Sequence, residues 1–191
     1  MRVNRNLSGK IRTRRARERG FGLIEAMNFA TLALVIGAIA VAGVARYMRH
    51  ARAAEAAASV TAIGTGCVAA FDRSDANEPS SGGHASRRFP TSASQTVPSD
   101  RTTVSGRRYQ SASYEWDTVP WRELKFSMNQ PQAYAYGFTS EGVGAEASAK
   151  ATAEGDLDGD KEFSRYVLRV LPDASLSARV AGQIDIENGD E

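Results

Sequence analysis

The strongest constraint on this chain is an uncharged apolar segment of twenty residues near its N-terminus. From Ala26 to Ala45 there is no charged residue, and the only polar side chains are those of Asn28 and Thr31. A helix rises about 1.5 Å per residue, so this segment would be about 30 Å long, which matches the apolar thickness of a bilayer. The segment is therefore predicted to be a membrane-spanning helix.

Charge is distributed unevenly around this segment. The 191 residues carry a formal net charge of +2, but residues 1–20 alone hold eight Lys or Arg and one acid, a net of +7, which leaves −5 for the rest. The larger basic cluster before the apolar segment favours a cytoplasmic N-terminus and export of the remainder. A basic leader on a mildly acidic body is not typical of a nucleic-acid-binding domain, so nucleic acid is not expected as a partner.

The helix is predicted to continue beyond the apolar segment, over residues 46–73. This stretch is rich in Ala, and its apolar residues recur at spacings of three and four, as in the stripe Val60, Ile63, Cys67, Val68 and Phe71. Such a stripe packs against a globular domain. The single cysteine cannot form an intramolecular disulfide and is expected to act as a small buried apolar residue.

A loop is predicted over residues 74–106, where Ser, Thr, Gly and Pro make up 18 of 33 residues. This composition is too polar to build a core. The arginines in and just after the loop are Arg87, Arg88, Arg101, Arg107 and Arg108. A solvated loop is favoured over a DNA-binding surface, because Phe89 is the one aromatic residue interleaved among the first four.

The aromatic residues gather after the loop, and residues 107–182 are predicted to form a small antiparallel sheet of three to five strands. The stretches "ELKFSM", "AYAYGFTS", "AEASAKATA" and "RYVLRVL" alternate large or apolar with small or polar residues, as half-buried strands do. Residues 183–191 are predicted to be a polar tail without fixed structure. The expected fold class is α+β, with a long N-terminal helix packed by its second half on a C-terminal antiparallel sheet.

The segment "RGFGLIEAM" resembles the processing site of type IV prepilins and the related pseudopilins. In that family a short basic leader ends in Gly, the next residue is usually Phe, and a Glu follows four positions later at the head of an apolar helix. Gly20, Phe21 and Glu25 occupy those places here. The resemblance covers about residues 15–50 and implies a pilin-like fold, removal of the leader by a prepilin peptidase between Gly20 and Phe21, and methylation of the new N-terminus.

The resemblance also implies what the chain does. After cleavage, the positive amine of Phe21 would pair with the Glu25 carboxylate of a neighbouring copy and so fix the register of a helical filament. The partners would be other copies of the chain and the inner-membrane assembly machinery. The protein would reside in the inner membrane first and then in an extracellular or periplasmic filament serving adhesion, motility or secretion. With no catalytic motif in the sequence, enzymatic activity and a required cofactor are not expected.

Several alternatives remain open at this stage. Within the family, the chain would be a pilus subunit, a type II secretion pseudopilin, or a minor pilin in DNA uptake. Outside it, the chain would be a membrane-anchored or secreted binding protein that does not polymerise. An uncleaved anchor, an ordinary secretory signal ending near Ala42, and a buried helix of a soluble domain are further explanations of the apolar segment. The secretory signal leaves Glu25 unexplained, and the basic leader argues against the buried helix.

An acidic cluster lies in the stretch "EGDLDGDKEFS". Asp156, Asp158 and Asp160 alternate around Gly159, and three carboxylates at steps of two can converge on a hard cation such as Ca²⁺. The match to an EF-hand loop is partial, because Lys161 stands at the place of the turn glycine and no Glu stands at the twelfth position. Asp and Gly also favour solvated turns without any metal, so a calcium site and a plain turn are both considered.

Overall fold

The computed structural model describes residues 22–77 and 87–189. The chain divides into two compact units, Met1–Gly43 and Val44–Glu191, and each is described by itself. Helix α1, Leu23–Asn77, begins in the first unit and ends in the second. Its residues 23–43 are called the exposed part and its residues 44–77 the packed part. The predicted leader, with Gly20 and Phe21, lies outside the described residues.

The exposed part of α1 is helical throughout and carries uncovered apolar side chains. These side chains are between 48% exposed, at Val35, and 81% exposed, at Leu23. By length and composition, α1 is a helix that could cross a membrane. The predicted apolar helix is therefore confirmed, and its large apolar side chains stay about half or more exposed among the described residues.

The packed part of α1 has a buried apolar stripe. The residues Val60, Ile63, Cys67 and Phe71 are fully buried, and Val68 packs at the edge of the core. These are the residues at helical spacing in the sequence, so the predicted stripe is confirmed. The helix extends four residues further than predicted, to Asn77.

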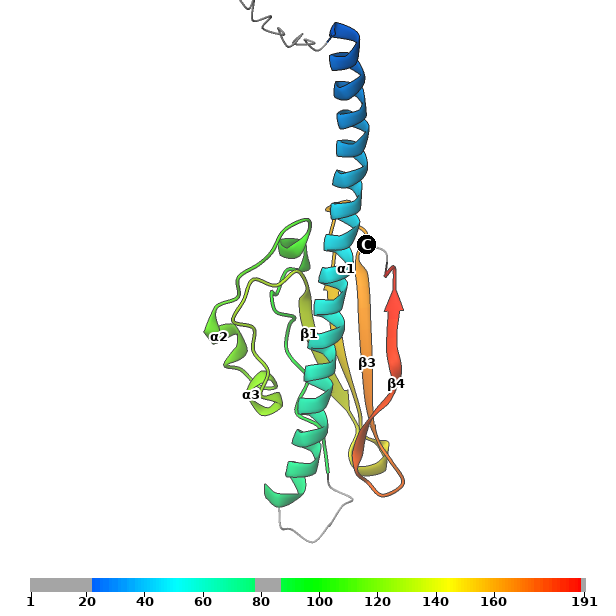
Figure 1. Cartoon of the computed structure of the whole chain (residues 1–191). Coiled ribbons are helices and arrows are strands. Elements are labelled where there is room, and N and C mark those ends of the chain that lie inside the picture. The colour runs from blue at the N-terminus through cyan, green and yellow to red at the C-terminus, as the bar shows by residue number, and fades with distance from the viewer. Residues whose placement is uncertain (1–21, 78–86, 190–191) are drawn as a thin grey trace, which may run out of the picture. The chain divides into compact units, whose positions relative to one another are not determined.

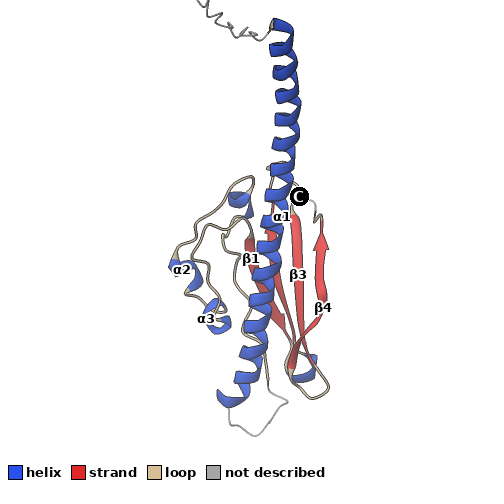
Figure 2. Ribbon diagram, in the orientation of Figure 1, coloured by secondary structure: helices blue, strands red, loops and turns tan. Residues whose placement is uncertain are grey.

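The sheet has four antiparallel strands in the order β1-β2-β3-β4 (Figures 1 and 2). The strands are β1 (Ala135–Glu141), β2 (Ser148–Gly155), β3 (Ser164–Pro172) and β4 (Ala178–Glu187). Buried and more exposed residues alternate along β2 and β3, as expected when one face covers a helix. In Figure 1 the packed part of α1 lies against this sheet, and α2 and α3 lie beyond β1, at the end of the sheet away from β4. The predicted α+β fold is confirmed.

Two glycines allow the helix to approach its neighbours closely. A Cβ placed on Gly64 would lie 2.5 Å from a side-chain carbon of Leu168 on β3. A Cβ on Gly66 would lie 2.2 Å from the backbone carbonyl oxygen of Leu124. The packed part of α1 therefore touches the sheet at one glycine and the segment containing α3 at the other.

The prediction of a strand at "ELKFSM" was wrong. The segment instead contains the end of α3 (Trp121–Leu124), preceded by another short helix, α2 (Ser113–Trp116). Trp121 and Leu124, three residues apart, are both buried, and the ring of Trp116 lies 5.1 Å from that of Trp121. A helical turn brings both side chains to one side, which an extended strand would not do.

The prediction that residues 74–106 contribute no core was also wrong. Phe89, Val97 and Val104 are buried, and the Phe89 ring lies 4.5 Å from that of Phe71. Val97 exchanges two backbone hydrogen bonds with Tyr136, at 2.8 and 2.9 Å. A short 3₁₀ helix, η2 (Arg101–Val104), follows, and a second one, η3 (Gly144–Glu146), precedes β2. Within residues 87–106, long-range contacts with α1 and β1 thus hold a polar segment in place.

The predicted polar tail begins too early at residue 183. Strand β4 continues to Glu187 and pairs with β3, with Tyr166 opposite Ile186 and Val167 opposite Asp185. Most of its side chains are exposed, so its own apolar content is low. Backbone hydrogen bonds to β3 hold the strand, and these do not depend on side-chain polarity.

Candidate functional site

The N-terminal end of α1 contains the first predicted site residue, Glu25. It lies in the first helical turn, and its Oε2 accepts a hydrogen bond from the backbone N–H of Gly22 at 3.2 Å. A carboxylate at this end of a helix interacts favourably with the unpaired amides and the helix dipole. Gly20 and Phe21 lie outside the described residues, so their geometry with Glu25 is not defined.

The surroundings of Glu25 limit what can neutralise it. No charged residue occurs between Glu25 and Arg46, which is 21 positions further along the helix. The hydroxyl of Thr31, in the same part of the helix, donates to the carbonyl of Met27 at 2.8 Å and is satisfied within the helix. In a low-dielectric environment, a positive partner for Glu25 has to come from the chain before the helix or from another molecule.

The acidic turn, residues 156–161, is the second predicted site. Carboxylate oxygens of Asp156, Asp158 and Asp160 lie within 4.8 Å of one another. Asp156 is fully buried, whereas Asp158 and Asp160 are exposed. The structure therefore brings the three predicted side chains together, in unequal environments.

Asp156 organises this turn. Its Oδ1 accepts a hydrogen bond from Gly159 N at 2.6 Å, and its Oδ2 accepts from Lys161 N at 3.0 Å and from the Ser105 hydroxyl. Its backbone carbonyl accepts from Gly106 N at 2.8 Å. Desolvation raises the pKa of Asp156, but the hydrogen bonds from Ser105, Gly159 and Lys161 outweigh it and hold the pKa below its usual value.

The other two carboxylates have weaker contacts. Oδ2 of Asp158 lies 3.7 Å from Nη1 of Arg49 on α1, and Oδ1 of Asp160 accepts from Glu162 N at 2.7 Å. Calcium takes six to eight oxygen ligands, and both oxygens of Asp156 already hold protein donors. Three carboxylates suit a hard cation chemically, but the turn is also stabilised by its own hydrogen bonds.

Several residues that fix the turn were missed in the sequence. Besides Ser105 and Arg49, Arg52 donates from Nη1 to the carbonyl of Leu157 at 3.3 Å. Arg49 and Arg52 are three residues apart on α1, a spacing that does indicate a shared face. Nothing in the local pattern around Ser105 indicates its contact with a residue 51 positions away.

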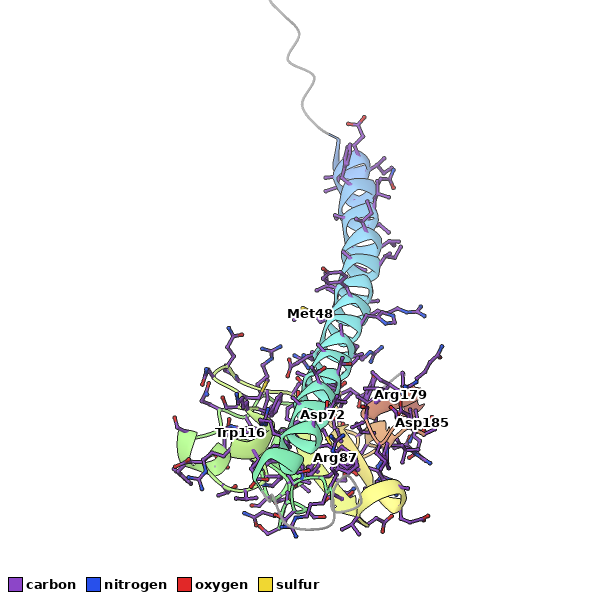
Figure 3. All side chains as sticks on the ribbon, turned by 90° about the horizontal axis from the view of Figure 1, so that it is seen from below. Met48, Asp72, Arg87, Trp116, Arg179 and Asp185 are labelled. Carbon is purple, nitrogen blue, oxygen red and sulfur yellow. The ribbon has the colours of Figure 1, made fainter. Side chains whose placement is uncertain are left out.

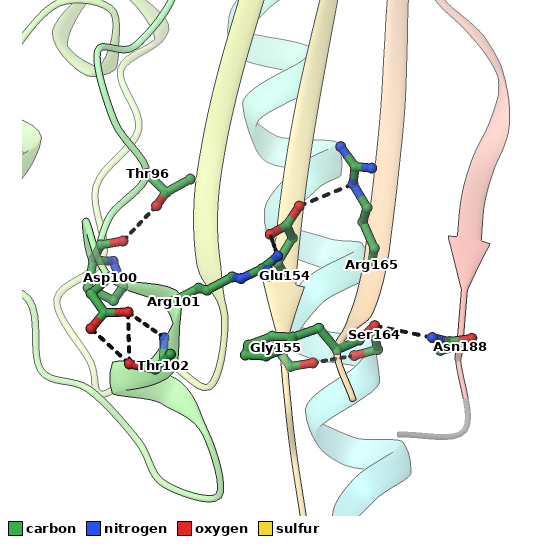
Figure 4. A network of polar contacts seen from close by, with 11 residues as sticks. Thr96, Asp100, Arg101, Thr102, Glu154, Gly155, Ser164, Arg165 and Asn188 are labelled. Atoms are coloured by element: carbon green, nitrogen blue, oxygen red, sulfur yellow. Dashed lines mark hydrogen bonds and ion pairs between the residues drawn. The ribbon is translucent and has the colours of Figure 1, made fainter. Parts of the chain in front are cut away.

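Glu154, which flanks the acidic cluster in sequence, lies in a separate polar network (Figure 4). Its carboxylate bridges Arg101 at 3.1 Å and Arg165 at 3.2 Å. The Arg101 guanidinium also lies 4.7 Å from the centre of the Phe163 ring. This network joins η2 to β2 and β3, so it holds the loop on the sheet and is not available as part of a cation site.

Two open clefts lie along the segment containing α2 and α3. One, of about 600 Å³, is lined by Tyr114, Trp116 and Asn129 among others, and the second, of about 660 Å³, by Arg73, Arg88 and Phe89 among others. Arg122 and Lys125 line both clefts. Figure 3 shows Trp116 on the opposite side of α1 from Arg179 and Asp185, so the Trp116 cleft lies away from β4.

Cys67 matches its prediction as a buried apolar residue. Its side chain is fully buried, and burial raises the pKa of the thiol to about 12. A thiol with this pKa is almost entirely protonated at neutral pH and is a poor nucleophile. The cysteine therefore contributes to packing.

Comparison with known proteins gives no relative. No family model, no curated protein and no solved structure matches the chain.

Proposed function

We propose that this chain is a subunit of a type IV pilus-like filament, in which residues 21–45 form the bundled core. The leader would be removed between Gly20 and Phe21, and the chain would leave the inner membrane for a filament outside it. The observation that carries the proposal is the order Gly20, Phe21 and Glu25 at the head of a continuous helix with exposed apolar side chains. The role is one of assembly, and no turnover of a substrate is proposed.

The physical case begins with the exposed part of α1. Burying a side chain of Leu, Ile, Val, Phe or Met stabilises by about 1.5–3 kcal/mol, and ten such side chains are exposed between Leu23 and Val41. A helix of this kind is stable only when lipid or other apolar helices cover it. A membrane before assembly and a helix bundle after it provide the same cover.

Glu25 supplies specificity in this scheme. A carboxylate among apolar helices costs several kcal/mol unless it is paired (about 3–5 kcal/mol when one partner of a buried pair is removed). The amine of Phe21, created by cleavage, is a partner present only on processed subunits. Pairing with Glu25 of a neighbour would therefore admit processed chains and set their axial position.

The first test is the N-terminal sequence of the mature protein. The proposal expects a start at Phe21 with a methylated amine. A mature chain that starts at Gly43, or retains the leader, would contradict it and favour secretion or a simple anchor.

The second test removes the charge of Glu25. Glu25→Leu and Glu25→Gln are expected to be processed normally but to be absent from filaments sheared off cells. Glu25→Gln keeps the size of the side chain, and Thr31→Val serves as a control because its hydroxyl bonds only within the helix. Normal filament yield from Glu25→Gln would show that the charge is not needed.

The same features fit a pilus subunit and a type II secretion pseudopilin equally well. Both classes share the cleavage segment and the apolar helix. We propose the pilus-like filament in its general sense, and the genes adjacent to this one would separate the two.

A calcium site at the acidic turn is a second candidate function, favoured by the clustering of the three carboxylates. Calcium is expected to raise the melting temperature of the full chain at millimolar concentration. Asp158→Asn with Asp160→Asn would abolish the rise and leave the Asp156 hydrogen bonds in place. Glu141→Gln with Glu146→Gln is the control, and an equal loss in both pairs would argue for non-specific screening.

A further inference from the structure

The cleft of about 660 Å³ at the end of α1 is strongly basic. Its cations come from three segments: Arg73 from α1, Arg88 from the chain before β1, and Arg122 and Lys125 from α3 and its C-cap. Glu123 is the one acidic residue among the described residues that line it. The chain after residue 20 carries −5 overall, so this concentration of positive charge is local and attracts anions.

Two of these cations, Arg73 and Arg122, make side-chain contacts within the described residues. Nη2 of Arg73 donates to the carbonyl of Glu123 at 2.8 Å, which uses one of its five N–H groups. Arg122 lies 3.7 Å from Asp117, and both side chains are exposed, so this pair is weak in water. A guanidinium fixed as that of Arg73 is, and one paired as weakly as that of Arg122, are both suited to binding phosphate oxygens.

Lys125 occupies an unusual backbone position. It is the C-cap of α3 in the left-handed region, with φ of 53°, where glycine is the usual residue. Its backbone N–H bonds the carbonyl of Arg122 at 3.2 Å. A lysine at this position places a cation at the border of the two clefts, which glycine would not do.

The neighbouring cleft adds an aromatic surface. Tyr114 is 76% exposed and lines it together with Arg122 and Lys125, whereas Trp116 and Trp121 are buried. An exposed aromatic ring next to cations is the arrangement that binds bases by stacking and phosphates by charge. Acidic polysaccharides would use the cations but gain nothing from the ring.

We propose that these two clefts form a binding site for single-stranded nucleic acid, with phosphates at the four cations and a base on Tyr114. This revises the expectation that nucleic acid is not a partner. It also differs from a surface made of the loop arginines, because Arg101 and Arg108 are paired with Glu154 and Glu55. The site is independent of whether the chain forms filaments.

The test uses the full chain in a non-ionic detergent and a fluorescent single-stranded DNA of about 15 nucleotides, a length that matches the larger site sizes of such proteins. Binding is measured by anisotropy at several salt concentrations. The cleft variant is Arg73→Gln, Arg88→Gln, Arg122→Gln and Lys125→Gln. The matched control changes four exposed cations elsewhere, Arg46→Gln, Arg107→Gln, Lys150→Gln and Arg169→Gln. The basic leader is present in both, so a difference between the two variants does not come from it.

The cleft variant is expected to lose at least tenfold in affinity, and its log–log salt slope should fall by about 2–3, since each phosphate contact on a single strand contributes about 0.7. The control should stay within about threefold. Thermal unfolding of both variants checks that they fold. Equal losses in the two variants, or no binding by the unchanged protein, would overturn the proposal.

Tyr114→Ala separates nucleic acid from other polyanions. It is expected to weaken single-stranded DNA binding about fivefold or more with an unchanged salt slope, because stacking carries no charge. Binding of the matched duplex and of a polyuronate should not respond to it. If single-stranded DNA is likewise unaffected, or the polyuronate competes equally at equal charge, the site is a general polyanion surface and the proposal is wrong.

Discussion

The exposed part and the packed part of α1 have similar side chains and opposite surroundings. Both are rich in Ala and aliphatic residues, yet Phe29 in the first is 59% exposed and Phe71 in the second is fully buried. The packed part also carries Arg49, Arg52 and Glu55, which bond to the rest of its own unit. The exposed part has Glu25 as its one charged residue, so its apolar surface and this carboxylate are what it presents to a partner.

The largest expected effect comes from the two phenylalanines. Phe71→Ala should lower the free energy of unfolding by about 3–5 kcal/mol, because it empties a site packed against Phe89. Phe29→Ala should leave it within about 0.5 kcal/mol. Denaturant unfolding of the detergent-solubilised chain, followed by tryptophan fluorescence, measures both. Comparable losses would mean that the exposed part packs on the same chain after all.

The glycines give the next comparison. Gly66→Ala should destabilise by about 1–3 kcal/mol, because its Cβ would overlap a backbone carbonyl oxygen that cannot move alone. Gly37→Ala has open space around it and should stabilise the helix by about 0.5–1 kcal/mol. Helix content and melting temperature report the two effects. A lower melting temperature in Gly37→Ala would mean that another group packs against Gly37, where the structure has open space.

The smallest expected effect is on the pH dependence of stability, through the acidic turn that contacts the packed part of α1. The pKa of Asp156 is lowered on folding, so its stabilisation is fully present above the unfolded value of about 3.9 and is lost as pH falls through the lower folded value. Asp156→Asn should cost about 1 kcal/mol at pH 7 and flatten this acid-side loss. Asp158→Asn, with an exposed carboxylate, is the control. An unchanged acid-side profile in Asp156→Asn would assign the loss to other groups.

Local pattern predicted those features that depend on one segment alone. The helix, its stripe from Val60 to Phe71 and the strands β1 to β3 follow from periodicity. The strand β4 did not, because its order comes from pairing with β3, and neither did the burial of Phe89, which depends on Phe71. The stretch that contains Leu124 was predicted as a strand, whereas Trp121–Leu124 form the short helix α3.

The candidate sites divide in the same way. Glu25 and the three aspartates were visible as short motifs. The partner of Asp156, Ser105, is 51 residues away, and the cations of the basic cleft come from three separate segments. Sites assembled by the tertiary fold leave no local signal in a single sequence.

The contact at Gly66 has a mechanical consequence. The residues one turn away on α1 are Ala62 and Ala70, and both carry a Cβ that would collide with the carbonyl of Leu124 if the helix slid by one turn. Steric contact thus restricts the packed part to a single axial position against the segment containing α3. A pull along α1 would load its buried contacts from Ala56 to Phe71 together, in shear, instead of releasing them one at a time.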